Sequence, residues 1–224
     1  MKFLDVLSAG KLGSTVFQGG RFGQIKRTLV IPVDPKTPIQ IVLRDNLKLV
    51  TQSWRTLTDP ERLVWIALAE TVMSKPKGGD QGPLTGVQLY TKINCVNLLC
   101  GNDMVRLPSP KPDYCPAVAT ALSIANPAGV LALKLTTIGE PTQANPWIVR
   151  ASPSQSPGCH KCDDLRIIGL APAPQNGLCD VSALHSARFG QPDIGRKIWV
   201  SICATHAGWE DFPREFVQIV PPPA

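Results

Sequence analysis

Two cysteines separated by two residues, in Cys159-His-Lys-Cys162, are the side chains of this sequence best placed for chemistry. Two thiolates at this spacing can share one Zn²⁺, and Cys179, Cys203 or His206 could complete a tetrahedral site. A second close pair, which would make zinc binding a firm prediction, is missing from the sequence. The pair is therefore a weak metal candidate. Three interpretations stay open: a metal site, a disulfide or redox pair, and ordinary thiols in a loop, which we favour.

The sequence offers little else that resembles a catalytic or cofactor-binding site. The three histidines, His160, His185 and His206, are scattered, and no G-x-S-x-G nucleophile motif is present. Asp163 and Asp164 are adjacent, and adjacent carboxylates in a turn or strand usually point apart instead of forming a dyad. We therefore expect a protein that is not an enzyme and that has no cofactor.

Positive charge is concentrated in the first half of the chain. Residues 1–107 contain 14 Lys and Arg against 8 Asp and Glu, whereas residues 108–224 contain 9 of each, so the first part carries the whole net charge of +6. This pattern fits either a solvated basic face or contact with nucleic acid or an acidic neighbouring subunit. The side chains expected to contact a subunit or an anionic partner are Arg21, Phe22, Lys26, Arg27, Lys36, Arg44, Lys48 and Arg55.

A β-hairpin is expected to present the first of these side chains. Residues 14–18 and 24–30 are rich in β-branched residues and flank the segment Gly19-Gly-Arg-Phe-Gly23, whose glycines are typical of a tight turn. The segment lacks the Gly-Lys-Ser or Gly-Lys-Thr ending of a phosphate-binding loop, and a strand follows it instead of a helix. Arg21 and Phe22 at the tip would then be placed to insert into an adjoining subunit.

Three short helices are expected next, each beginning at a threonine. Thr37, Thr58 and Thr85 are followed three residues later by Gln or Glu, which is the pattern of a capping box. Apolar residues at spacings of three and four mark the side of each helix expected to be buried. In the second helix, Trp65 and Leu68 are expected to face a different neighbour. The third helix is expected to end at Gly101. The residues expected on the buried sides of the three helices are, in order, Ile39, Leu43, Leu47, Val50 and Trp54, then Leu63, Ile66, Ala67 and Met73, and then Tyr90, Ile93 and Val96.

The proline-rich segment Leu107-Pro-Ser-Pro-Lys-Pro-Asp113 is expected to divide the chain, because each proline fixes φ and lacks an N–H donor. Residues 1–107 would form a hairpin and three-helix module. Residues 108–224 would form an antiparallel β-sandwich with a short crossing helix at residues 180–190, capped by Asp180, and a proline-rich tail. The predicted fold class is α+β. The expected strands of the sandwich are residues 121–125, 130–137, 147–151, 165–170, 197–205 and 216–220.

The end of the chain resembles the last two strands of fibronectin type III modules. The resemblance lies in Lys197-Ile-Trp-Val-Ser-Ile-Cys-Ala-Thr-His-Ala-Gly-Trp209, followed after a turn by Phe216-Val-Gln-Ile-Val220. It implies an immunoglobulin-like or fibronectin III-like sandwich for residues 108–224. A fold of this kind carries no particular activity with it.

A second resemblance spans most of the chain. Segments that carry it include Gly13-Ser-Thr-Val-Phe17, Pro32-Val-Asp-Pro-Lys-Thr37, Arg62-Leu-Val-Trp-Ile66 and Gly195-Arg-Lys-Ile-Trp-Val200. Their order is similar to a poorly characterised family of proteins encoded by bacteriophages and prophages, often found among virion genes. The resemblance implies a structural protein of a virion or a similar homopolymeric assembly. Its partners would be copies of itself and other virion proteins, and its location would be the virion.

Two other functions stay open on the sequence alone. A nucleic-acid-binding module would use the basic residues of the N-terminal half, although no known reading motif is present. An adhesin or carbohydrate-binding module is suggested only by the fibronectin-like half.

The sequence also predicts where the chain is made. Asp5 interrupts the apolar core that a secretory signal peptide needs, so we expect synthesis in the host cytoplasm without a signal peptide. The longest uncharged apolar run falls far short of the ~20 residues of a membrane-spanning helix, so no membrane partner is expected.

Overall fold

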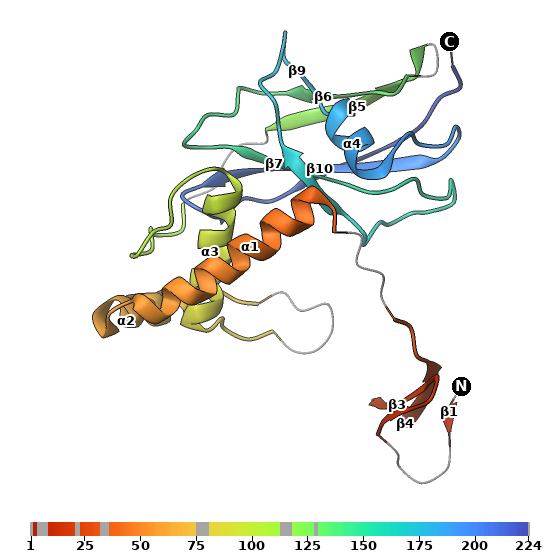
Figure 1. Cartoon of the computed structure of the whole chain (residues 1–224). Helices are drawn as coiled ribbons and strands as arrows, with labels where there is room; N and C mark the ends of the chain where they lie inside the picture. Colours follow the sequence, from red (N-terminus) through yellow and green to blue (C-terminus); the bar gives the residue numbers. More distant parts are fainter. Residues whose placement is uncertain are drawn as a thin grey trace. The chain divides into compact units, whose positions relative to one another are not determined.

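The chain forms two compact units, residues 1–36 and residues 37–224 (Figure 1). The computed structural model describes residues 2–3, 9–20, 23–31, 36–74, 81–112, 118–127 and 130–223. The boundary expected at Leu107 lies inside the second unit, which contains both the helices and the strands that follow them. The combination of helices and antiparallel sheets confirms the predicted α+β class.

The first unit is a small antiparallel sheet with the strand order β1-β4-β3-β2. Its centre is the expected hairpin, formed by β3 (Thr15–Gly20) and β4 (Gly23–Thr28), which pair from Thr15 opposite Thr28 to Gly20 opposite Gly23. Two shorter strands, β1 (Lys2–Phe3) and β2 (Gly10–Leu12), flank the hairpin. The predicted tip residues Arg21 and Phe22 lie outside the described residues.

The second unit begins with the three expected helices: α1 (Pro38–Ser53), α2 (Asp59–Ala69) and α3 (Gly86–Leu99), with a short 3₁₀ turn at Trp54–Thr56. Each helix has the predicted threonine at its N-cap and a capping box. At α3, for example, the Thr85 N–H donates to Gln88 Oε1 at 2.9 Å, and the Gln88 N–H donates to Thr85 Oγ1 at 3.3 Å. The helix starts are therefore confirmed.

Tyr90 of α3 is at the centre of the helical core. Its ring centroid lies 5.1 Å from that of Trp65 in an edge-on arrangement and 5.2 Å from that of Trp54, and the Trp65 Nε1–H donates to the carbonyl of Arg106 at 2.8 Å. Such aromatic contacts stabilise a core beyond the area they bury. The buried residues of this core are Val50, Leu57, Trp65, Ala69, Leu89, Tyr90, Ile93 and Trp209.

The predicted buried side of α2 is wrong. Trp65 and Ala69 face the core, whereas the residues expected there, Leu63, Ile66, Ala67 and Met73, are exposed. Residues 63–69 are apolar without interruption, so their spacing does not select one side, and the large Trp65 ring takes the interior position. In α1 the expected side is correct except for Leu47, which is exposed.

The remaining strands form two antiparallel sheets (Figure 1). One contains β5 (Ala119–Ala125), β6 (Ala132–Thr137) and β9 (Leu178–Asp180) in the order β5-β6-β9. The other contains β7 (Trp147–Ala151), β8 (Arg166–Leu170), β10 (Lys197–His206), β11 (Trp209–Glu210) and β12 (Arg214–Ile219), with β10 between β7 and β12. All six expected strands are present, with ends displaced by two residues at most.

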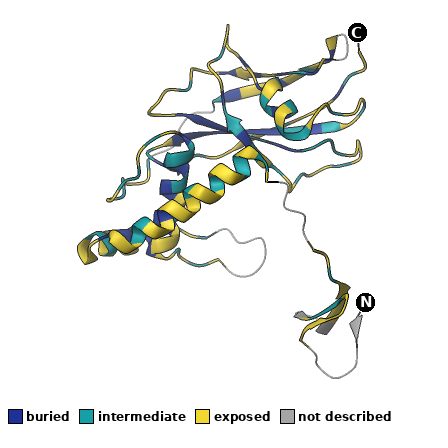
Figure 2. Ribbon diagram, in the orientation of Figure 1, coloured by how far each residue is buried: buried dark blue, intermediate teal, exposed yellow. Residues whose placement is uncertain are grey.

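One hydrophobic core joins the inner faces of these two sheets. It contains Leu133 and Leu135 from β6, Val149 from β7, and Val200 and Ile202 from β10. The opposite face of the larger sheet contacts the helical layer, because Val96 and Cys100 at the end of α3 pack on Ile148 of β7. The helices and both sheets thus form one continuous body, in which β7 and β10 are the most deeply buried strands (Figure 2).

The crossing helix is present as α4 (Ser182–Phe189), but its predicted cap is wrong. Asp180 is the last residue of β9, a three-residue strand that the sequence did not predict, and Val181 occupies the N-cap. Asp180 still stabilises the start of the helix, since its Oδ1 accepts from the Ser182 N–H at 2.9 Å and from the Ser182 hydroxyl at 2.5 Å. Within the part of the chain that the structure describes, no helix has the length and apolar character needed to cross a bilayer.

Candidate functional site

The structure distributes the predicted contact residues over both units. Lys26 and Arg27 are neighbours on β4, and their side chains point to opposite faces of the small sheet because strand residues alternate. Lys26 Nζ lies 5.9 Å from the centroid of the Phe17 ring, within range of a cation–π contact. Lys36, also exposed, is the last residue of the first unit. The remaining predicted residues, Arg44, Lys48 and Arg55, belong to the second unit.

The predicted contact residues of the second unit, Arg44, Lys48 and Arg55, lie on exposed positions of α1 and of the turn after it. Arg44 and Lys48 are one helical turn apart and share a side of α1. Arg55 lies in the 3₁₀ turn, where its carbonyl accepts from Arg62 Nη2 at 3.0 Å. These positions leave the side chains of Arg44, Lys48 and Arg55 at the protein surface, as a contact role requires.

An exposed apolar stripe runs along α2. Pro60, Leu63, Val64 and Ala67 are all exposed, and their spacing of three, four and seven residues places them on one side of the helix. Leu63 has 64% of its surface exposed. We call these four residues the α2 stripe. Charged side chains are absent from it, so the side of α2 that faces solvent resembles the buried side of an ordinary amphipathic helix.

Exposed apolar residues also occur on α1, where Ile41, Val42 and Leu49 lie before and after the charged residues Arg44, Asp45 and Lys48. Figure 2 shows the exposed side of this helix continuing along most of its length. The two helices differ in charge. Residues 38–53 contain two basic residues and one acidic residue, whereas residues 59–70 contain one basic residue and three acidic residues. The net charges of the two segments are therefore +1 and −2.

Arg106 contacts the start of α2 at Glu61. Its Nε and Nη2 atoms donate to the two carboxylate oxygens of Glu61 at 2.7 Å and 2.9 Å. These hydrogen bonds, together with one from the Thr58 N–H, lower the pKa of Glu61 from 4.5 to about 2. Glu61 of α2 is paired with Arg106, and Trp65 of α2 is buried in the helical core. The residues of the α2 stripe are exposed to solvent.

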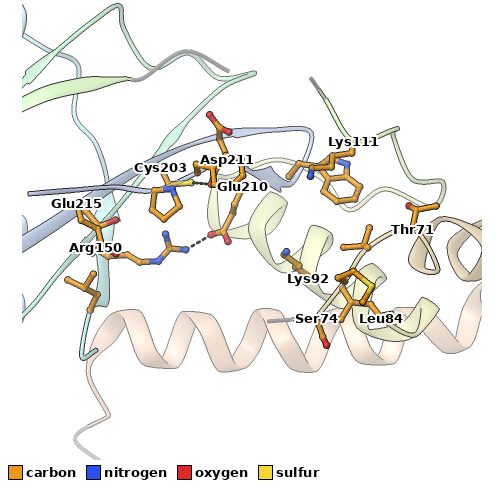
Figure 3. A pocket seen from close by; sticks show the side chains of 17 residues that line it. Thr71, Ser74, Leu84, Lys92, Lys111, Arg150, Cys203, Glu210, Asp211 and Glu215 are labelled. Carbon is orange, nitrogen blue, oxygen red and sulfur yellow. Dashed lines mark hydrogen bonds and ion pairs between the residues drawn. The ribbon is translucent and has the colours of Figure 1, made fainter. Parts of the chain in front are cut away.

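A cleft of about 910 Å³, lined by both charged and apolar residues, lies between α3, the chain that connects α2 to α3, and the outer face of the larger sheet (Figure 3). Arg150 on β7 donates to the carboxylate of Glu210 on its floor. Lys92 and Lys111 also line the cleft. Arg150, Lys92 and Lys111 are matched by three acidic residues, Glu210, Asp211 and Glu215, so the cleft has no excess charge of either sign.

Two side chains of β10 line the same cleft. Burial, followed by the charge of Glu210, raises the pKa of Cys203 to about 11, and its thiol donates to the Asp211 carbonyl at 3.1 Å. A thiol held in this form is a poor nucleophile at neutral pH. Ser201 is buried, and its hydroxyl has no hydrogen-bond partner among the described residues. The cleft thus offers hydrogen bonding and a balanced set of charges.

Cys159 and Cys162 are both half-buried free thiols. The Cys159 thiol donates to the carbonyl of Lys161 at 3.0 Å. Within the described ranges, no group of three or more His, Cys, Asp and Glu side chains is arranged to hold a metal ion. The third ligands considered from the sequence are engaged elsewhere: Cys179 and Cys203 are buried and donate to carbonyl groups, and His206 Nδ1 lies 2.6 Å from Asn145 Oδ1.

Two comparisons with known proteins found no relative of this chain. The chain matches no protein-family model, and a search of curated proteins also finds no match. Its function is therefore argued from the side chains and surfaces described above.

Proposed function

We propose that this chain is a structural subunit of a bacteriophage virion or a similar homopolymeric assembly, and that it acts through contacts with copies of itself. The observation that carries the proposal is the α2 stripe, a continuous apolar side of a well-anchored helix that faces solvent. The resemblance to phage-encoded proteins supports a virion as the setting. In that setting, other virion proteins would be further partners.

The α2 stripe is suited to a protein contact because the backbone that carries it is already helical. A preformed helix has no backbone ordering left to complete on binding, so less of the gain from covering the stripe is lost. Fully burying a Leu or Val side chain contributes about 1.5–3 kcal/mol, so covering the exposed 64% of Leu63 and 46% of Val64 stabilises an interface by about 2–3 kcal/mol in total. Repeated at each contact of a polymer, a contribution of this size favours the assembled state.

Charge complementarity favours a second copy as the occupant. The exposed side of α1 carries Arg44 and Lys48, whereas Glu70 is exposed at the end of α2 and Asp59, at its start, is ion-paired with Arg62. A neighbour that places its α1 against α2 would bring opposite charges together around the apolar side chains. Complementary charges at the rim of an apolar contact set its register and partner.

We also propose that the β-rich part is a fibronectin III-like sandwich that serves as the body of the subunit. Support comes from two antiparallel sheets over one core and from β10 and β12, which are antiparallel neighbours at the end of the chain. The same segments carried the resemblance in the sequence. The fold itself implies no activity, which is consistent with a structural role.

Sedimentation velocity on matched variants tests the proposal. Leu63→Gln with Val64→Gln makes the α2 stripe polar without changing the charge. The control, Val130→Gln with Ile138→Gln, changes two equally exposed residues in loops of the β-rich part. We expect the stripe variant to shift toward the 24.2 kDa monomer and the control to assemble as the unmodified chain does. Equal assembly of both variants would overturn the role of α2.

A further inference from the structure

Charge and burial set the first unit apart from the rest of the chain. Residues 1–36 contain six Lys and Arg and two Asp, a net charge of +4, whereas the remaining 188 residues carry +2. The strands that the structure describes in this unit contain Lys and Arg but no Asp or Glu. Most of the net charge of the protein therefore belongs to a separate unit of 36 residues.

The small sheet also has no buried core among its described residues. Side chains of residues 9–18 and 25–31 are exposed or half-buried, and Leu12 and Ile31 have 73% and 79% of their surface exposed. Isolated sheets of this size are marginally stable unless a face packs against something else. A partner that covers one face would stabilise the unit, and the charge of the unit restricts what that partner can be.

The strand register places basic side chains on both faces. Lys11, Val16 and Arg27 are directly paired across β2, β3 and β4, so they project from the same face. Lys11 and Arg27 flank Val16 at a spacing of roughly 10 Å, twice the distance between neighbouring strands. Neither has an ion-pair partner among the described residues. Lys26 projects from the opposite face, beside Phe17.

We propose that the small sheet, through Lys11 and Arg27 with Lys26 on its other face, binds the phosphate backbone of nucleic acid. Phosphate binding needs closely spaced cations and does not need apolar burial, which matches a basic sheet without a core. Two copies of the sheet packed on one another would place +4 against +4, which disfavours self-association as the explanation for its exposed residues.

This inference goes beyond the proposed function and does not depend on it. The α2 stripe belongs to the second unit, so a variant of the small sheet leaves the residues proposed for self-assembly unchanged. Failure of one proposal would therefore be distinguishable from failure of the other. Together they describe a subunit that contacts its copies with one unit and the nucleic acid with the other.

The test compares two variants of the full chain that have the same net charge. Lys11→Ala with Arg27→Ala removes two basic residues from the sheet, and the control, Lys134→Ala with Arg196→Ala, removes two exposed basic residues from the second unit. Both lower the net charge from +6 to +4. Binding to a fluorescein-labelled duplex of arbitrary sequence is measured by anisotropy between about 50 and 200 mM salt, the range in which counterion release dominates. Labelled poly-glutamate serves as a second ligand.

We expect the unmodified chain and the control to bind the duplex with the same salt dependence. The sheet variant should lose affinity roughly tenfold or more, and its slope of log K against log salt should fall by about 1.8, the value for two lost phosphate contacts. Equal losses in both variants would overturn the proposal, since net charge alone would then explain binding. Absence of duplex binding, or tighter binding to poly-glutamate, would also overturn it and would indicate an acidic protein partner in the second case.

Discussion

Substituting Gly208 with alanine should strongly destabilise the second unit. Gly208 has a φ of +82°, and a Cβ at this position would lie 2.5 Å from Ile93 Cγ2 and 2.6 Å from the Ile93 carbonyl oxygen on α3. A side chain in this conformation costs about 1–2 kcal/mol, and overpacking a buried site costs a further ~1–3 kcal/mol. We therefore expect Gly208→Ala to lower the free energy of unfolding by about 2–5 kcal/mol, measured by urea denaturation with tryptophan fluorescence.

Gly195→Ala is the matched control. Gly195 has a similar φ of +75°, but a Cβ there would meet no atom within 4 Å. The control should lose only the backbone contribution of about 1–2 kcal/mol. Equal losses in the two variants would refute the close packing of α3 on the turn between β10 and β11. They would also remove a main reason for treating the helices and sheets as one body.

Two further predictions concern pH. Arg106 holds the pKa of Glu61 at about 2, well below its ordinary 4.5, so this carboxylate stabilises the fold above pH 4.5 and the stabilisation is lost as pH falls through about 2. Glu61→Gln should flatten the dependence of Tm on pH in that window, and an unchanged dependence would contradict the pairing. Burial lowers the pKa of His185 below 6.5, so stability should fall as pH drops below 6.5, and His185→Gln should remove this loss in the same Tm series.

Local signals in the sequence predict the starts of α1, α2 and α3, but not the N-cap of α4. Thr37, Thr58 and Thr85 specify their capping boxes with residues only three positions away, so no distant contact is needed to read them. The hairpin of β3 and β4 is similarly local. By contrast, β9 has three residues and is held in place by pairing with β6, more than 40 residues earlier in the chain, which periodicity cannot reveal.

The interaction surfaces were harder to predict, because they depend on which side of a helix the core selects. Leu63 was expected in the core and is exposed, since Trp65 packs on Tyr90 and donates to the Arg106 carbonyl instead. The cleft beside α3 could not be predicted from the sequence. Its lining residues come from segments as distant as Thr71 and Glu215, and only the folded chain brings them together.

The molar mass of the unmodified protein in solution tests the central claim most directly. It would be measured by light scattering after size exclusion, at low and high salt and in the presence of reductant, so that neither charge nor disulfide formation explains the result. The proposed function predicts a mass of several times 24.2 kDa that persists at high salt, because apolar side chains such as Leu63 form the contact. A single species of 24.2 kDa at every concentration and salt would contradict self-assembly.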